Sequence, residues 1–243
     1  MTFQEFLIEG FVGHYARHNL VGTAYALLTG VAILLCLLTY FVGSLNFSII
    51  ISKRYHNDDI RNYGSGNAGT TNMLRTYGRR AAVLTLAGDA LKAVVSTLFG
   101  YALLGFTGAY VSGFFCILGH CFPIYYKFKG GKGIVTAAFM VLLLDWRVFC
   151  VLLFIFAALL IATKMVSFAS VISVMLFPIL LERFNGPGIP IIFAMLIMLL
   201  IVFMHRENIL RIYRGQESKV DLSKLFSKKK AEANQAEESG NDR

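Results

Sequence analysis

Seven apolar stretches constrain the fold of this chain more than any other feature. They run over about 21–51, 81–104, 107–126, 130–144, 148–163, 165–181 and 188–204. A helix needs about 20 apolar residues to cross the hydrocarbon core of a bilayer. Of all residues, 56% are hydrophobic and only 15% are charged. The pattern predicts an all-α, polytopic membrane protein with seven transmembrane helices.

Two of these stretches, 130–144 and 148–163, are short for a complete span. They meet at Asp145-Trp146-Arg147, a polar and aromatic turn typical of a membrane interface. A five-span arrangement, with this pair re-entrant, is the alternative. Either number is odd, so the two termini are expected on opposite sides of the membrane.

The basic residues predict the orientation. If the loop over 52–80 is cytoplasmic, 19 of the 23 Lys and Arg residues fall on the same side. Since cytoplasmic loops carry the excess of basic residues, the N-terminus is expected outside and the C-terminus inside. The net charge of +9 then reflects loops that face anionic lipid, and no nucleic-acid partner is expected.

Composition predicts three parts. Residues 1–21 form an N-terminal extracytoplasmic extension, 22–217 the transmembrane domain, and 218–243 a disordered cytoplasmic tail rich in Lys, Glu, Ser, Ala and Asn. The stretch 21–51 is expected to be one long helix whose far end faces other parts of the protein. The four cysteines lie in apolar segments without metal-ligand spacing, so no metal site is expected.

Gly64–Gly78 is a polar, glycine-rich island between apolar stretches. Its glycines allow backbone N–H groups to converge on one point, and Arg75 adds a guanidinium that can grip a phosphate with two bonds. The segment therefore predicts an anion-binding loop, with an ordinary polar turn as the alternative. It also imitates a dinucleotide fingerprint, which we reject because no strand precedes it and no crossover helix follows.

Gly119–Thr136 is a second segment of this kind, and it contains Lys129-Gly130-Gly131-Lys132-Gly133 just before an apolar stretch. Free glycine amides at the start of a helix, with two lysines, predict a second anion site. A basic turn whose glycines allow close helix packing is the alternative. The segment is not a P-loop, because Lys132 is followed by Gly133 rather than by Ser or Thr.

A third polar cluster, Met204–Ile209, follows the last apolar stretch on the same predicted side. His205 and Asn208 are three residues apart and share one helix face. Within the apolar stretches, Asp89 and Lys92 have the same spacing and are expected to pair, because an isolated charge in the bilayer is costly.

These motifs resemble those of the bacterial acyl-phosphate:glycerol-3-phosphate acyltransferases, the PlsY family. The resemblance runs from about Gly43 to Gly215. It rests on Ser65–Arg75, on Gly119–Gly133, on His205–Ile209 and on a Gly-Asp-x-x-Lys from Gly88 to Lys92. The chain departs from the family at Ala68 and Asn46, where the family usually has proline, and at Ala93, where it usually has glycine.

The resemblance implies a seven-helix protein of the bacterial inner membrane with a cytoplasmic active site. It implies transfer of a fatty acyl group from acyl phosphate to the 1-hydroxyl of sn-glycerol 3-phosphate, giving lysophosphatidic acid and phosphate. Both substrates and membrane lipid are the expected partners, no cofactor is expected, and the oligomeric state is left open. The implied catalytic residues are His205, Asn208, Arg75 and Lys132. The implied substrate-binding residues are Ser65, Gly66, Asn67, Gly69, Thr70, Asn72, Lys129, Gly130, Gly131, Gly133 and Ser170, and Glu217 is implied to be structural.

Two mechanisms are open for the hydroxyl proton. His205 could remove it as a general base, or an oxygen of the acyl phosphate could take it while His205 orients the substrate. We favour the substrate-assisted version. The competing classes are a transporter of organic phosphates and a non-catalytic lipid-binding protein.

Overall fold

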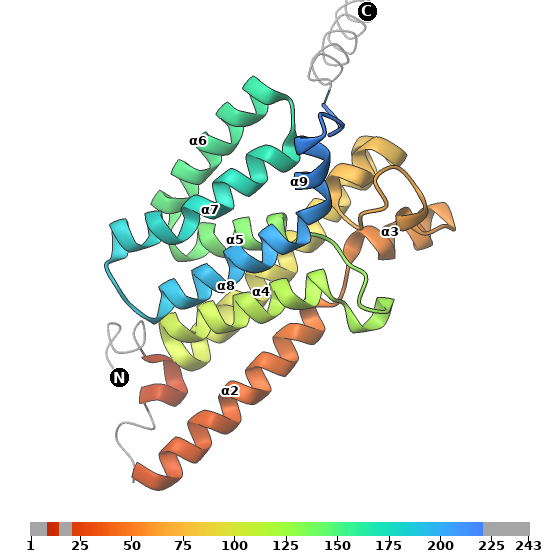
Figure 1. Cartoon of the computed structure of the whole chain (residues 1–243). Coiled ribbons are helices and arrows are strands. Elements are labelled where there is room, and N and C mark those ends of the chain that lie inside the picture. The colour runs from red at the N-terminus through yellow and green to blue at the C-terminus, as the bar shows by residue number, and fades with distance from the viewer. Residues whose placement is uncertain (1–8, 15–20, 221–243) are drawn as a thin grey trace, which may run out of the picture.

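A computed structural model describes residues 9–14 and 21–220 of the chain (Figure 1). Within these ranges the regular structure is helical. The predicted N-terminal extension and C-terminal tail lie largely outside the described residues. Besides the short helical segment 9–14, the helices are α2 (Val21–Gly43), α3 (Phe47–His56), η1 (Ile60–Asn62), α4 (Thr70–Cys121), η2 (Ile124–Tyr126), α5 (Ile134–Leu144), α6 (Trp146–Thr163), α7 (Val166–Asn185), α8 (Ile189–Met204) and α9 (Arg206–Tyr213).

The first apolar stretch is broken, so the prediction of one long helix was wrong. α2 ends at Gly43 and α3 begins at Phe47 after the N-cap residue Asn46. The Asn46 side chain accepts hydrogen bonds from the Ile49 amide (3.2 Å) and the Ser48 hydroxyl (2.6 Å). A buried asparagine that caps a new helix competes with continuation of the old one. The polar residues of this region are buried in protein, as expected: Ser44, Asn46, Ser48 and Ser52 are each 0% exposed.

α4 is a hairpin of two antiparallel helical limbs, which correspond to the stretches 81–104 and 107–126. The backbone leaves helical geometry first at Gly78 (φ +82°), which sets the short segment 70–77 apart from the first limb, and again at Leu104 and Gly105, where Gly105 has φ +61°. A Cβ on Gly100 would lie 2.3 Å from the Gly108 carbonyl oxygen. Residues eight apart in a straight helix would be separated by about 12 Å. The chain therefore reverses direction here, with its two limbs in contact.

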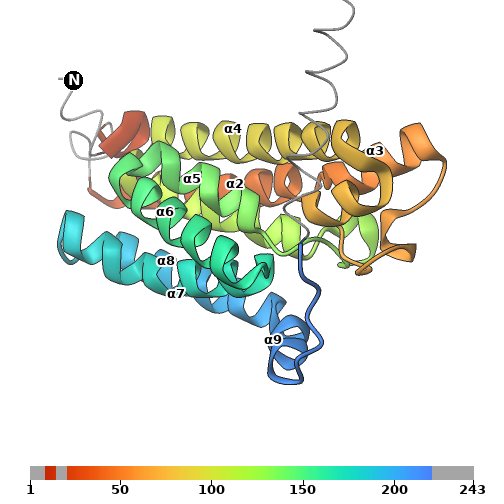
Figure 2. The ribbon, with the colours of Figure 1, turned by 90° about the horizontal axis from the view of Figure 1, so that it is seen from above.

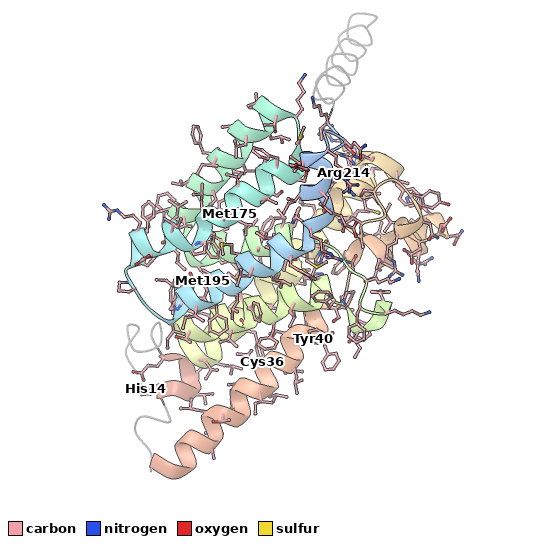
Figure 3. All side chains as sticks on the ribbon, in the orientation of Figure 1. His14, Cys36, Tyr40, Met175, Met195 and Arg214 are labelled. Carbon is pink, nitrogen blue, oxygen red and sulfur yellow. The ribbon has the colours of Figure 1, made fainter. Side chains whose placement is uncertain are left out.

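The helices lie side by side, and the ends that carry polar segments gather together. Figure 2 shows α4 above α2 and α5, with α7 and α8 below, and with α3 and α9 at the same end of the bundle. Side chains fill the space between the helices (Figure 3). The largest buried cluster joins the second limb of α4 to α5, α7 and α8, and includes Tyr110, Met140, Phe177, Leu181 and Ile197.

The described part of the chain has the character of a membrane protein. Four helices are long and apolar enough to cross a bilayer, and a fifth span arises if α8 and α9, bent by 57° at His205, are taken together. α5 is shorter, with 11 residues. At the α5–α6 turn, Asp145 accepts hydrogen bonds from the amides of Arg147 (3.0 Å) and Val148 (3.3 Å), and so starts α6.

Candidate active site

A cavity of about 720 Å³ lies where the three predicted polar segments meet. Its volume is in the usual range for a small-molecule site. One end is polar and the other is apolar. The polar lining comprises Gly64, Ser65, Asn67, Gly69, Thr70, Thr71, Asn72, Arg75, Asp89, His120, Lys132, Gly133, Ser167, Ser170, Ser173, His205, Asn208, Arg211, Glu217 and Ser218. Of the 15 residues named from the sequence, all line it except Gly66, Lys129, Gly130 and Gly131.

The start of α4 faces this cavity without a side-chain cap. Its N-cap is Gly69, which offers no side chain to the first amides of the helix. Thr70 and Thr71 line the cavity, and the buried Thr70 hydroxyl has no hydrogen-bond partner among the described residues. Arg75 stands on the same first turns of the helix. An uncapped helix start beside a guanidinium is an anion-binding arrangement.

Asn72 shapes the loop that leads into α4. Its side-chain nitrogen donates to the carbonyls of Ile60 (3.2 Å), Tyr63 (2.9 Å) and Asn67 (3.0 Å). Its side-chain oxygen accepts from the Ser65 amide at 3.0 Å. Asn72 is 2% exposed, so these internal bonds occupy its polar atoms and fix the course of the loop.

The loop before α5 differs from the expected cradle of free amides. The Gly130 amide donates to the Cys121 carbonyl and the Gly131 amide to the His120 carbonyl, both at 3.1 Å. These N–H groups are therefore engaged within the protein. The glycines instead allow close packing: a Cβ on Gly131 would lie 2.2 Å from His120 Nε2 and 2.5 Å from the Ala68 carbonyl oxygen.

Arg61 and Asn46 tie these two loops to the rest of the site. The Arg61 guanidinium donates to the carbonyls of Tyr126 and Lys129, both at 3.0 Å. Asn46 and Ala68, two departures from the family motif, contact each other, since the Asn46 side chain donates to the Ala68 carbonyl at 3.3 Å. The loops before α4 and α5 are thus held by hydrogen bonds from outside them.

Lys132 belongs to a network that reaches the C-terminal segment. Its ammonium donates to Asn208 Oδ1. Glu217 accepts from Asn208 Nδ2 (2.7 Å), from the Ser167 hydroxyl (2.6 Å) and from Arg211 Nε (2.9 Å). The amide of Asn208 is thereby fixed between a cation and a carboxylate, with its oxygen toward Lys132.

Burial changes the protonation of this network. It lowers the pKa of Lys132 to about 8, because the charged ammonium loses solvation, although Glu217 acts in the opposite direction. Burial raises the pKa of Glu217, but hydrogen bonds from Ser167, Asn208 and Arg211 outweigh it, so this pKa lies below its usual value. Near neutral pH, Lys132 is charged and Glu217 is ionised.

His205 stands at the bend between α8 and α9 and is 3% exposed. Its Nδ1 lies 2.8 Å from the Ile201 carbonyl oxygen. Because a carbonyl only accepts, Nδ1 carries the proton in the neutral ring, which leaves the lone pair on Nε2. His205 lines the cavity, so the ring presents one fixed tautomer beside Lys132 and Asn208.

A buried charge cluster lies beneath the polar end. Lys92 pairs with Asp89 at 2.9 Å, as the sequence predicted, and also donates to the carbonyls of Gly43 (2.9 Å) and Leu45 (2.7 Å). His120 Nδ1 lies 2.9 Å from the same ammonium. Lys92 thus satisfies carbonyls at the break between α2 and α3, while Asp89 and His120 line the cavity.

The remaining lining is apolar and comes from α5, α6 and α7, with contributions from α4 and α8. It comprises Leu86, Ile134, Val135, Ala137, Ala138, Phe139, Val141, Phe149, Leu152, Leu153, Phe156, Val166, Val174, Phe177 and Ile201. One cavity therefore joins a cationic, hydrogen-bonding end to a long apolar section.

Sequence reasoning did not assign Asp89, His120, Ser167 or Arg211 to the site. Thr71 was expected within the anion-binding segment Gly64–Gly78, and it lines the cavity. Asp89 and His120 come from different limbs of α4, and only the hairpin brings them to one place. Arg211 enters through the bend after α8, which the sequence pattern does not specify.

Comparison with known proteins gives a consistent result. The family model described as "Glycerol-3-phosphate acyltransferase" matches residues 33–215. A glycerol-3-phosphate acyltransferase of Thermoanaerobacter sp. (strain X514) is 39% identical over 189 residues, which cover 78% of this chain and 96% of the relative. One of Jannaschia sp. (strain CCS1) is 39% identical over 195 residues, covering 80% and 94%.

Solved structures agree with this assignment. The crystal structure of PlsY, an integral membrane glycerol 3-phosphate acyltransferase, in its glycerol 3-phosphate form has a TM-score of 0.75 and 30% identity, covering 80% of this chain and 98% of that protein. Its lysophosphatidic acid form has a TM-score of 0.73 with the same identity and coverage. The chain belongs to the glycerol-3-phosphate acyltransferase family of integral membrane proteins.

Proposed function

We propose that this acyltransferase uses acyl phosphate as its donor and transfers the acyl group to the 1-hydroxyl of glycerol 3-phosphate. The products are lysophosphatidic acid and inorganic phosphate. The single observation that carries the proposal is the one cavity with a cationic end and an apolar section. Acyl phosphate likewise has a charged end and an apolar part, since it joins a phosphate to a fatty acyl chain.

The two substrates bring two phosphates into the polar end. The uncapped start of α4 with Arg75 would hold one of them, and Lys132 with Ser170 would hold the other. The apolar section adjoins Ser170 on α7, so the second position suits the phosphate of the acyl donor. Ser65, Asn67, Gly69 and Thr70 would complete the first position.

Some of the predicted substrate-binding residues would act by shaping the loops rather than by touching substrate. Gly66, Asn72, Lys129, Gly130 and Gly131 are assigned this role. Asn72 and the two adjacent glycines have their polar backbone or side-chain groups engaged internally, and the Lys129 carbonyl is bonded to Arg61. Gly133, which lines the cavity, has φ +79° just before α5 and would let the chain turn into that helix.

In the reaction, the hydroxyl oxygen of glycerol 3-phosphate forms the new ester bond at the acyl carbonyl carbon, and the carbon–oxygen bond to phosphate breaks. The hydroxyl proton passes to an oxygen of the acyl phosphate and leaves with inorganic phosphate. Lys132 and Arg75 stabilise negative charge on the carbonyl oxygen and the departing phosphate. His205 and Asn208, each fixed by hydrogen bonds, orient the acceptor hydroxyl.

The proposed membrane arrangement has seven spans, with the N-terminus outside and the cavity at the cytoplasmic side of the bacterial inner membrane. Counting the two limbs of α4 separately and including α5 and α8 supports seven. Residues 22–217 would form the membrane domain, flanked by the extension and the tail. A membrane-impermeant thiol reagent added from outside should label a cysteine placed at Trp146. Labelling of a cysteine placed at Lys164 instead would show that the orientation is the opposite of the one proposed.

The direct test uses purified protein with radiolabelled glycerol 3-phosphate and one donor at a time: palmitoyl phosphate, palmitoyl-CoA or palmitoyl acyl-carrier protein. The proposal predicts a lipid-extractable product and equimolar phosphate with acyl phosphate alone. Turnover with either thioester at a comparable rate would refute the donor assignment. Uptake of glycerol 3-phosphate into vesicles without chemical change would indicate a transporter.

A further inference from the structure

The apolar section of the cavity ends part-way along α5 and α7. Val141 is the last lining residue on α5, Val174 and Phe177 are the last two on α7, and the three are only 5%, 8% and 2% exposed. We call these three residues the floor. Behind the floor, in the same buried cluster, lie the fully packed side chains of Tyr110, Val148 and Leu181, each at most 1% exposed.

The side of the section is different from its end. Leu86 on α4 and Leu153 on α6 also line the cavity, yet they are 38% and 50% exposed. In a membrane protein such exposed leucines face lipid, so the section is open sideways and closed at its end. A lipid-borne donor can enter from the side, and its chain must then lie along the section or turn back toward lipid.

The length of the section follows from α7, which lines it from Ser170, beside the proposed donor phosphate, to Phe177, seven residues apart. At a rise of about 1.5 Å per residue this is about 10 Å. An extended alkyl chain advances about 1.25 Å per carbon, as follows from a C–C bond of about 1.5 Å at the tetrahedral angle. About eight carbons of an extended chain therefore reach the end of the section, and a longer chain must press on that end or leave sideways past Leu86 and Leu153.

We propose that the floor, formed by Val141, Val174 and Phe177, sets the longest acyl chain that the enzyme uses efficiently. This inference rests on the proposed acyl-transfer function and adds to it a determinant of donor specificity. A chain that is too long would have to displace Phe177. The Phe177 ring packs against the buried core, and a close-packed protein interior has a low compressibility, so the ring cannot move far.

Two substitutions at the floor should act in opposite directions. Phe177→Ala removes a ring at the closed end and lengthens the section by about two carbons. Val174→Phe adds a ring and shortens it. Met175, labelled on α7 in Figure 3, lies between them in the chain. It is 48% exposed and is not among the residues that line the cavity, so Met175→Ala is the matched control.

The experiment offers each purified variant an equimolar mixture of acyl phosphates of 6 to 18 carbons with glycerol 3-phosphate, and measures the product chain lengths by mass spectrometry. Burial of each further methylene is worth a factor of about four, so two carbons should change the ratio of longer to optimal product by about 15-fold. Phe177→Ala should favour longer chains, Val174→Phe shorter ones, and Met175→Ala should match the wild type.

An unchanged distribution in both floor variants, whatever their total rate, would overturn the proposal and would mean that the chain turns back past Leu86 and Leu153. Phe177→Leu, which preserves more of the core, replaces Phe177→Ala if that variant does not fold. Failure of the proposed function looks different, because the wild-type protein would then make no product of any chain length.

Discussion

At the scale of single residues, we expect Lys132 to make the activity sensitive to alkaline pH. Its pKa of about 8 is lower than that of a free lysine, so its charge is present below about pH 8 and is lost above it. Since kcat/KM follows the protonation of the free enzyme, it should fall about ten-fold per pH unit above pH 8.

The control for this prediction is Lys132→Arg. A guanidinium stays charged throughout the range, so the variant should keep part of its activity and lose the alkaline fall. A pH–rate profile of both proteins measures this. If kcat/KM of the arginine variant falls near pH 8 as it does in the wild type, a group other than Lys132 causes the fall.

His205 decides between the two routes for the hydroxyl proton. Glutamine can place a hydrogen-bonding amide near the position of Nε2 but cannot act as a base. If the acyl phosphate takes the proton, His205→Gln should keep kcat within about ten-fold of the wild type. Loss of general-base catalysis would instead cost about 100- to 10,000-fold, and a kcat reduced to that extent would favour the base role. His205→Ala should lose activity by either route.

At the scale of elements, Gly131 sets how closely the loop before α5 packs on the second limb of α4. A Cβ there would lie 2.2 Å from His120 Nε2, so Gly131→Ala must displace the loop that carries Lys132. We expect a loss of at least ten-fold in kcat/KM for both substrates, measured by initial rates. Gly30→Ala on α2 is the matched control, because a Cβ there meets nothing within 4 Å; equal effects of the two variants would contradict this role of Gly131.

Lys92 joins three elements, since it contacts carbonyls at the end of α2 and side chains on both limbs of α4. Lys92→Met would leave the buried Asp89 carboxylate without its ammonium partner and with only the His120 ring, 3.5 Å away, beside it. Breaking a buried ion pair in this way typically costs about 3–5 kcal/mol. We therefore expect a marked fall in the thermal unfolding temperature. Adding Asp89→Asn should recover part of the loss, because the uncompensated carboxylate is then removed. If the losses in unfolding temperature caused by Lys92→Met and Asp89→Asn simply add in the double variant, loss of the ion pair is not the cause.

Several features of these elements could be read from the sequence, and others could not. Apolar stretches located the helices because a bilayer imposes a minimum length, and the spacing of Asp89 and Lys92 indicated their pairing. The break between α2 and α3 was not predicted, because a hydrophobicity pattern does not reveal that one buried asparagine, Asn46, caps a new helix. The engaged amides of Gly130 and Gly131 were also missed, because glycine spacing does not show which carbonyls lie opposite.

At the scale of the whole molecule, the sequence predicted that three separate polar segments would meet, and 11 of the 15 named residues line one cavity. Charge asymmetry placed the three segments on one side of the membrane, and the family resemblance supplied the individual residues. The apolar section could not be predicted, because its lining residues are indistinguishable in sequence from those that face lipid. Met175 and Phe177 are neighbouring apolar residues of α7, yet Phe177 lines the cavity while Met175 is 48% exposed, and only the packing of the helix decides which is which.

The central claim is that one cavity holds the acyl donor and glycerol 3-phosphate together, without an acyl-enzyme. The most direct measurement is a matrix of initial rates in which both substrates are varied, with phosphate release followed in the absence of glycerol 3-phosphate. The account predicts intersecting double-reciprocal lines and no burst of phosphate without the acceptor. Parallel lines with a stoichiometric phosphate burst would show that the acyl group first bonds to the protein, and would contradict it.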